Sequence, residues 1–544
     1  MNVSTRRPRR RRLALALTAT GSLLLAPGAL PAAAHTPAEG LSQAPAQVSR
    51  DGRAAPPVAA KLDPGLRTAG QGQVDVVVTG SPGRGAAVAA VVRAAGGAVT
   101  APLPVVDGVR ARVPADRLDD VAAAPVVRAV TANRSGRFQQ LIYSDATTSS
   151  SFARSTGATT LWAQGSTTGR GVGVAVLDTG VSPMRDLAGR LVHGPDLSGE
   201  GTVVDTYGHG TVMAGIVGGS GQDSADSPGG ARTGVAPEAT VVSVKVAGRN
   251  GATDVSTVLQ GMHWVAAYRD QFDIRVLNLS WGTASTQSPG LDPLNYAVER
   301  LWRLGIVVVT AAGNSGPGTG TILKPADDPL VITVGAYDDK SDTDPANDVV
   351  PAWSSRGPTA AGLAKPDVVA PGRTLVATRS FGSRVEAENP RSLVAPSYIT
   401  GSGTSQAAAV TSGGVALLLQ QRPGLTPDQV KGVLTGTAAP IEGMTADDQG
   451  AGRIALDRAA AASPGLLVQQ HGVATGLGSL ESSRGRHVEV DCGEDGLVDV
   501  VQGERDTRCE AWDGAAWTGA AWTGAAWTGA AWTGAAWTGA AWTG

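Results

Sequence analysis

The sequence predicts an α/β protein whose main part is a doubly wound, mostly parallel sheet. Two observations predict this architecture. Between residues 152 and 460, short β-branched apolar runs alternate with longer helical stretches, as in a parallel sheet covered on both faces. Ahead of them, fewer than 80 residues show a β-α-β-β-α-β order, which is typical of a small α+β, ferredoxin-like module.

The first 34 residues are typical of a signal peptide. Six arginines precede an apolar run over 13–30, and Ala32 to Ala34 supply a small-residue cleavage signal. Arg6 and Arg7 fit a twin-arginine signal, and an uncleaved N-terminal anchor is the alternative. No later segment has about 18 consecutive apolar residues, so we expect a secreted, extracellular protein without a membrane span after signal removal.

The overall charge gives no reason to bind nucleic acid. The formal net charge is −2, and without the six leading arginines the chain has 39 basic and 47 acidic residues. A mildly acidic protein has no general electrostatic attraction to nucleic acid or anionic lipid, so both partner classes are excluded.

Residues 35–60, rich in Ala, Pro, Gly and Ser, form a predicted linker, and residues 61–135 form the small module. Its strands are expected at 74–78, 97–102, 108–113 and 126–131, and its helices at 86–95 and 114–123. In the main domain, residues 152–460, strands are expected at 172–177, 240–246, 274–280, 306–311 and 331–334. Its helices are expected at 255–268, 294–304 and 406–421.

The C-terminal part is predicted to hold a small β-rich segment, residues 465–510. Its two cysteines, Cys492 and Cys509, are close enough in sequence to form one disulfide outside the cell, and two free thiols are the alternative. Residues 511–544 repeat Trp-Thr-Gly-Ala-Ala, and a five-residue period forms neither a helix face nor a strand face. Such a low-complexity tail could stack on sugars or cell-wall polymer, or it is a slipped DNA repeat without a role, which we favour.

Four motifs hold side chains that suit nucleophilic catalysis. Ser405 follows Gly401-Ser402-Gly403-Thr404 at the expected start of a helix, where its N–H could bind an oxyanion; a helix-capping serine is the alternative. His209, between Gly208 and Gly210, offers a base that titrates near neutrality; its alternative is a polar contact at a helix start.

Asp178 and Asn314 stand at the ends of two of the predicted strands. Asp178 closes an apolar run at the edge where parallel sheets gather ligands, and it could orient His209. Asp-Thr-Gly also occurs in aspartic proteases, but the sequence has no second copy to share a proton. Asn314, in Ala311-Ala312-Gly313-Asn314, could donate to an oxyanion or simply form a turn.

The order Asp178, His209, Asn314, Ser405, with these motifs, resembles the subtilisin-like serine protease family (subtilases) over residues 169–440. Ser280-Trp281-Gly282, Ser355-Arg356-Gly357-Pro358 and Lys365-Pro366-Asp367 are similar too. The resemblance implies a Ser405–His209–Asp178 triad with Asn314 in the oxyanion hole. It also implies that 280–282 and Gly251 flank the peptide substrate, and that Ala311, Ala312 and Gly313 floor a roomy, apolar-leaning pocket.

The resemblance further implies that the module at 61–135 is a propeptide, a folding aid and intramolecular inhibitor that is cleaved off between 132 and 155. An ordinary β-rich accessory domain is the alternative. The chemistry needs no cofactor. Many subtilases bind structural calcium, but no acidic cluster here is spaced to place such a site. The chain departs from the family at Gln406, Ala409 and Val212, where Met, Pro and His are frequent. A catalytically silent glycan- or wall-binding protein on the same fold is the alternative function.

Overall fold

The computed structural model describes residues 61–63, 66, 72–137, 151–165, 167–226, 231–285, 288–465, 469, 488–490 and 499–501. The signal peptide, the linker, Cys492, Cys509 and the Trp repeat lie outside these residues and remain predictions. No helix within the described part is both long and apolar enough to cross a membrane.

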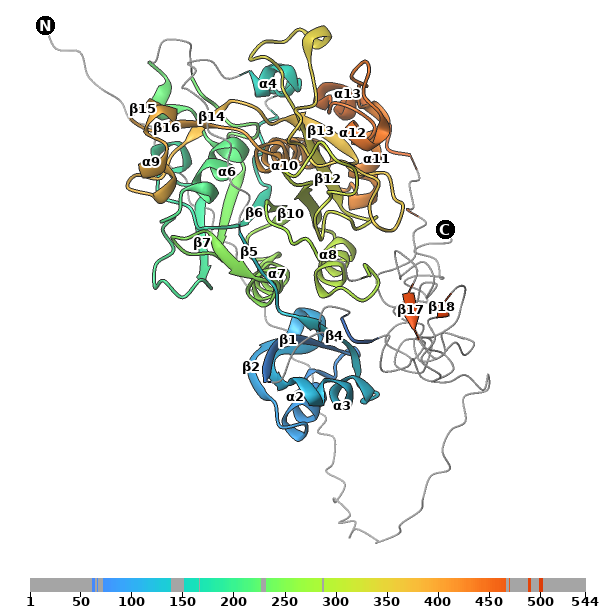
Figure 1. Cartoon of the computed structure of the whole chain (residues 1–544). Helices are drawn as coiled ribbons and strands as arrows, with labels where there is room; N and C mark the ends of the chain where they lie inside the picture. The colour runs from blue at the N-terminus through green and yellow to red at the C-terminus, as the bar shows by residue number, and fades with distance from the viewer. Residues whose placement is uncertain are drawn as a thin grey trace, which may run out of the picture. The chain divides into compact units, whose positions relative to one another are not determined.

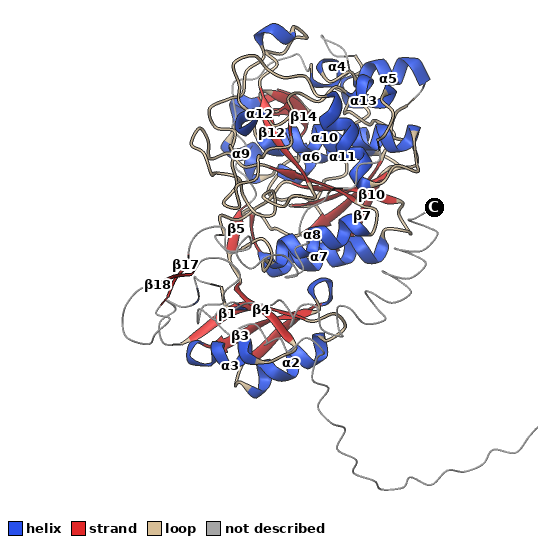
Figure 2. Cartoon of the chain, turned by 90° about the vertical axis from the view of Figure 1, so that its right-hand side faces the viewer, coloured by secondary structure: helices blue, strands red, loops and turns tan. Residues whose placement is uncertain are grey.

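The N-terminal module is a four-stranded antiparallel sheet covered on one face by two helices (Figures 1 and 2). The strands follow the order β2-β3-β1-β4, and the element order is the predicted β-α-β-β-α-β. The core forms where valines of β1 meet Val88 and Val92 of α2 and Leu118 and Val121 of α3. The elements are β1 (Gln73–Gly80), α2 (Gly85–Ala94), β2 (Ala98–Leu103), β3 (Gly108–Pro114), α3 (Leu118–Ala123) and β4 (Val127–Ala132).

One prediction in the module was wrong in detail. The helix expected over 114–123 is a 3-10 turn at Ala115–Arg117 followed by the short α3. Pro114 belongs to β3, because its fixed φ also suits an extended strand end, and its missing N–H costs nothing there.

The main domain is built on the predicted parallel sheet, with seven strands in the order β13-β12-β11-β10-β6-β8-β7. All neighbouring pairs are parallel. The strands are β6 (Gly173–Asp178), β7 (Leu191–Asp196), β8 (Thr240–Lys245), β10 (Ile274–Leu279), β11 (Val307–Ala311), β12 (Ile332–Tyr337) and β13 (Val368–Pro371).

The two edge strands of this sheet, β7 and β13, were not predicted. β7 is only half-buried and reads Leu-Val-His-Gly-Pro-Asp, so it has no continuous apolar run. β13 has four residues and ends at Pro371. Its outer side makes only an isolated bridge between Val369 and Arg453, so the missing N–H of Pro371 interrupts no ladder there.

Helices cover both faces of the sheet (Figure 2). α7 (Val255–Tyr268) and α8 (Pro293–Arg303) lie on one face, and α6 (His209–Gly218), α10 (Thr404–Gln421) and α11 (Pro427–Thr437) lie on the other. The residues of α10 from Thr404 to Leu419 are all buried, and this helix packs on β10, β11 and β12. A buried helix of mostly small residues therefore holds its first turn rigidly against the strand ends.

Candidate active site

Three of the predicted site residues stand at element ends on the same edge of the main sheet. Asp178 is the last residue of β6, His209 the first of α6, and Ser405 the second of α10. All three side chains are fully buried. Parallel strands bring their carboxyl ends to one edge, and Asp178 and His209 meet there although they are distant in sequence.

The geometry of Asp178 and His209 is that of an oriented base. Nδ1 of His209 lies 2.7 Å from Oδ1 and 2.9 Å from Oδ2 of Asp178. A carboxylate only accepts hydrogen bonds, so the imidazole carries its proton on Nδ1 and keeps Nε2 as the proton acceptor. The backbone N–H of Thr179 donates to Asp178 Oδ1 at 2.8 Å and fixes the carboxylate in turn.

A residue that sequence analysis did not single out, Asp205, holds this pair in place. Its Oδ1 accepts from Thr179 Oγ1 at 2.8 Å and from the Gly208 N–H at 2.6 Å, and its Oδ2 accepts from the Thr211 N–H and hydroxyl. Burial raises the pKa of Asp205 to about 6, although these four donors oppose the rise. In the sequence, Asp205 is an acidic residue four positions before His209. Neither a helical nor a strand periodicity marks that position.

Ser405 and Asn314 present the groups that an oxyanion site needs. Oγ of Ser405 and Nδ2 of Asn314 are buried, and neither has a hydrogen-bond partner among the described residues. Oδ1 of Asn314 accepts from the backbone N–H of Thr404 at 2.9 Å and from its hydroxyl at 3.0 Å. With its oxygen held by the residue before Ser405, the amide directs Nδ2 away from Thr404. Ser405 lies in the first turn of α10, where N–H groups have no intrahelical acceptor.

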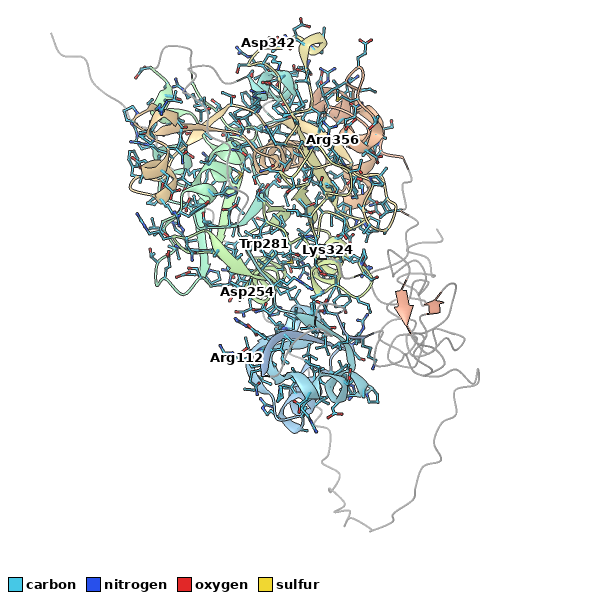
Figure 3. The ribbon with its side chains drawn as sticks, in the orientation of Figure 1. Arg112, Asp254, Trp281, Lys324, Asp342 and Arg356 are labelled. Atoms are coloured by element: carbon cyan, nitrogen blue, oxygen red, sulfur yellow. The ribbon has the colours of Figure 1, made fainter. Side chains whose placement is uncertain are left out.

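Ser280 contacts the first turn of α10, and the side chains of Ser280 and Trp281 are buried. Ser280 Oγ donates to the Ser405 carbonyl at 3.3 Å and accepts from Asn278 Nδ2 at 3.1 Å. Trp281 is 1% exposed and lies in the domain core (Figure 3). A Cβ on Gly282 would lie 2.7 Å from the Lys324 carbonyl oxygen. A substrate strand here would therefore meet main-chain atoms.

The residues at the end of β11 must be small. Ala311 and Ala312 are buried, and Gly313 has φ +122° with Ser355 Oγ only 2.6 Å from the place a Cβ would take. The Gly313 N–H donates to Thr404 Oγ1 at 3.1 Å, and the Ser315 N–H to Ser355 Oγ at 3.1 Å. Ser355, in one of the motifs noted above, thus holds the segment that carries Asn314.

A segment of the chain itself pairs with the strand edge at Gly251 that is predicted to bind the substrate. β9 (Ala252–Asp254), which follows Gly251, pairs antiparallel with β5 (Ser135–Arg137), the strand just after the N-terminal module. The Ser256 N–H donates to Asn133 Oδ1 at 3.1 Å beside this pair. Gly251 has φ +68°, and the ring of Tyr207 lies 2.8 Å from where its Cβ would be.

The module also contacts α7 and α8 of the main domain. Arg300 Nη1 donates to the Val105 carbonyl and pairs with Asp107 Oδ2, both at 2.9 Å. Arg110 pairs with Asp254 at 3.2 Å. These pairs are partly exposed.

Among the described residues, no group of three or more His, Cys, Asp or Glu side chains could hold a metal ion. A buried serine, an oriented imidazole and an amide nitrogen are the set of groups that acyl transfer uses.

Known proteins resemble this chain over its main domain. The model of the subtilase family matches residues 169–461. Serine protease AprX of Bacillus subtilis (strain 168) is 42% identical over 273 residues, which are 49% of this chain and 61% of AprX. Subtilisin Savinase of Lederbergia lenta is 34% identical over 275 residues, 50% of this chain and 86% of Savinase.

The chain thus spans less than two thirds of the length of AprX. The subtilisin-like protease SBT6.1 of Arabidopsis thaliana is 32% identical over 316 residues, which are 55% of this chain and 26% of SBT6.1. Among solved structures, fervidolysin from Fervidobacterium pennivorans aligns with a TM-score of 0.59 at 24% identity, over 74% of this chain and 63% of fervidolysin. That likeness shows the fold.

Proposed function

Since more than half of the chain matches its family model, the protein belongs to the subtilase family, and we propose that it is an exported serine endopeptidase. The observation that carries this proposal is the buried His209–Asp178 pair at the sheet edge that also presents Ser405 and Asn314. A binding protein without activity would have no need for an oriented imidazole at the same edge as a buried serine and a buried amide nitrogen that lacks a partner among the described residues.

In this mechanism Ser405 Oγ attacks the scissile carbonyl while His209 Nε2 takes its proton. His209 then gives the proton to the leaving amine, and water reverses the steps to release the acyl group. Asp178 keeps the Nδ1 proton in place and stabilises the imidazolium. The negative charge on the carbonyl oxygen is met by Asn314 Nδ2 and the Ser405 N–H, which are positioned before the reaction starts.

The substrate would bind as an extended strand between residues 280–282 and the segment 251–254. Main-chain pairing recognises peptide of almost any sequence, so specificity falls to the pocket floored by Ala311, Ala312 and Gly313. These residues bring no charge, which supports a preference for apolar side chains before the cleaved bond.

The β5–β9 pair supports an inhibitory role for the N-terminal module. β5 lies on the same edge that a substrate strand would use, so the module and a substrate compete for it. We place the maturation cleavage after Arg137 and before Ser151, by the enzyme's own active site.

The test is N-terminal sequencing of the secreted protein beside its Ser405→Ala variant. The wild type should appear shortened by a cut between 137 and 151, should hydrolyse casein and should react with a fluorophosphonate. The variant should keep the module and do neither. An unreactive, uncut wild type would reject the proposal.

For the Trp repeat at 511–544 we favour a repeat without a role, and contact with cell wall is the alternative. Its removal should leave casein hydrolysis unchanged, and only a loss of retention on purified cell wall would support the alternative. Equal retention with and without the tail would assign it no such role.

A further inference from the structure

Gln406, the residue after the nucleophile, has a buried carboxamide without a partner. The side chain is fully buried, and neither Nε2 nor Oε1 has a hydrogen-bond partner in the part of the chain that the structure describes. Burying an unpaired amide costs free energy, so such a group calls for a partner from outside the protein.

The ordinary structural role of this residue is excluded by its surroundings. Gln406 is the third residue of α10, the position from which a glutamine commonly bonds back to the N–H of the residue before the helix. Here that residue is Gly403, whose N–H donates to the Gly372 carbonyl at 2.8 Å. Gly403 also has no side chain to complete a capping box.

The carboxamide instead faces the space above Gly403, together with the oxyanion donor of Asn314. A Cβ built on Gly403 would lie 2.8 Å from Gln406 Oε1 and 3.2 Å from Asn314 Nδ2. Two amides from different elements therefore border the same small space, next to Ser405, and the glycine keeps it open. The end of a glutamine side chain turns easily, so Nε2 can take the place of Oε1.

We propose that Gln406 is a catalytic residue that donates its Nε2–H to the oxyanion, as a third donor beside Asn314 Nδ2 and the Ser405 N–H. This inference rests on the proposed endopeptidase function. In the free enzyme the amide presents either atom to the space. When the carbonyl oxygen gains negative charge, the orientation with Nε2 forward becomes the favoured one.

The matched variants are Gln406→Met, which has similar length without the amide, and Gln406→Glu, which replaces the donor by an acceptor. Loss of a donor used only in the transition state lowers kcat and leaves KM unchanged. We expect Gln406→Met to lower kcat about tenfold and to change KM by less than about twofold. Gln406→Glu should lower kcat further than Gln406→Met at pH 8.

A second measurement separates this role from packing. A peptide aldehyde with an apolar last residue adds to Ser405 and places its oxygen in the oxyanion position, whereas the corresponding peptide alcohol does not. Gln406→Met should weaken binding of the aldehyde about tenfold and leave binding of the alcohol unchanged. Thermal unfolding of each variant in the Ser405→Ala background reports any loss of packing.

Equal kcat and equal aldehyde affinity in Gln406→Met and wild type would overturn the inference, as would equal losses for aldehyde and alcohol together with a lower Tm. In both cases the wild type still cleaves casein. A wild type that neither cleaves casein nor binds the aldehyde would instead reject the endopeptidase function itself.

Discussion

Asp205 accepts two hydrogen bonds of 2.8 Å from Thr211, one from its backbone N–H and one from its hydroxyl. The other oxygen of the same carboxylate binds Thr179, which follows Asp178 in the chain, and Gly208, which precedes His209. One buried side chain thus ties the end of β6 to the start of α6. The spacing of Asp178 and His209 therefore depends on a residue outside the predicted site.

Replacing Asp205 by Asn should lower activity without touching the triad. An amide nitrogen would face two of the four donors that the carboxylate accepts from, so the start of α6 must shift. We expect kcat to fall about tenfold, with a smaller change in KM. Casein-peptide kinetics measure this, and Asp270→Asn, an exposed change of the same type, serves as the control. Unchanged kcat would show that α6 is held by other contacts.

The pKa of Asp205 also gives the protein a pH-dependent stability. The pKa is about 6 in the folded state against an ordinary value of 3.8, so between about pH 4 and 6 the folded state keeps a proton that the unfolded chain has lost. The contribution of this group is therefore complete below about pH 4 and is lost as the pH rises to about 6, by up to about 3 kcal/mol.

Urea unfolding at several pH values between 4 and 7 measures this effect, in the Ser405→Ala background to prevent autolysis. The Asp205→Asn variant is the reference, because its amide does not titrate at this position. The difference in unfolding free energy between the two proteins should change through this pH window. A difference that is the same at every pH would contradict the assignment.

The sequence predicted the sheet and the main site residues because both follow from local patterns. Buried strands such as β6 and β11 appear in the sequence as apolar runs, and Asp178 and Asn314 lie at or just after the ends of those runs. Asp205 and Gln406 could not be assigned in this way, because their roles depend on which atoms are paired and which remain unpaired after folding. The edge strands β7 and β13 lack the burial or the length that produces a readable pattern.

Replacing Asn314 by Ala tests how much its amide contributes to kcat as a donor to the oxyanion. The change removes Nδ2 and also the oxygen that Thr404 binds. We expect kcat to fall about 10²–10³-fold with little change in KM, as for loss of one preorganised donor. Burst kinetics with an ester substrate measure the acylation step. A loss confined to KM would mean that Asn314 binds the ground state instead.

Asp367, in the Lys365-Pro366-Asp367 motif, should matter for stability. Its carboxylate pairs with Lys365 at 2.7 Å and with Lys431 at 3.0 Å, and burial lowers the pKa of Lys431 to about 8. Asp367→Asn leaves two buried ammonium groups without their anion, so unfolding free energy should fall by about 3–5 kcal/mol at pH 7. Urea unfolding measures this, with Asp270→Asn as the exposed control. A loss below about 1 kcal/mol would show that the lysines find other partners.

The last prediction concerns release of the N-terminal module. Asp107 pairs with Arg300 of the main domain, whereas Asp120 pairs with Arg117 inside the module. Asp107→Asn keeps the oxygen that accepts from the Gly83 N–H and removes only the charge toward Arg300. If the module inhibits as proposed, the cleaved module should dissociate about three- to tenfold faster in Asp107→Asn, and the activity lag should shorten accordingly.

Asp120→Asn, the matched change within the module, should leave the lag at its wild-type length. Because the Asp107–Arg300 pair is partly exposed, about 1 M salt should screen it and bring the wild-type lag close to that of Asp107→Asn. An equal lag for both variants in low salt would show that this pair does not hold the module. The β5–β9 strand pair and the Arg110–Asp254 ion pair would then hold the module in its place.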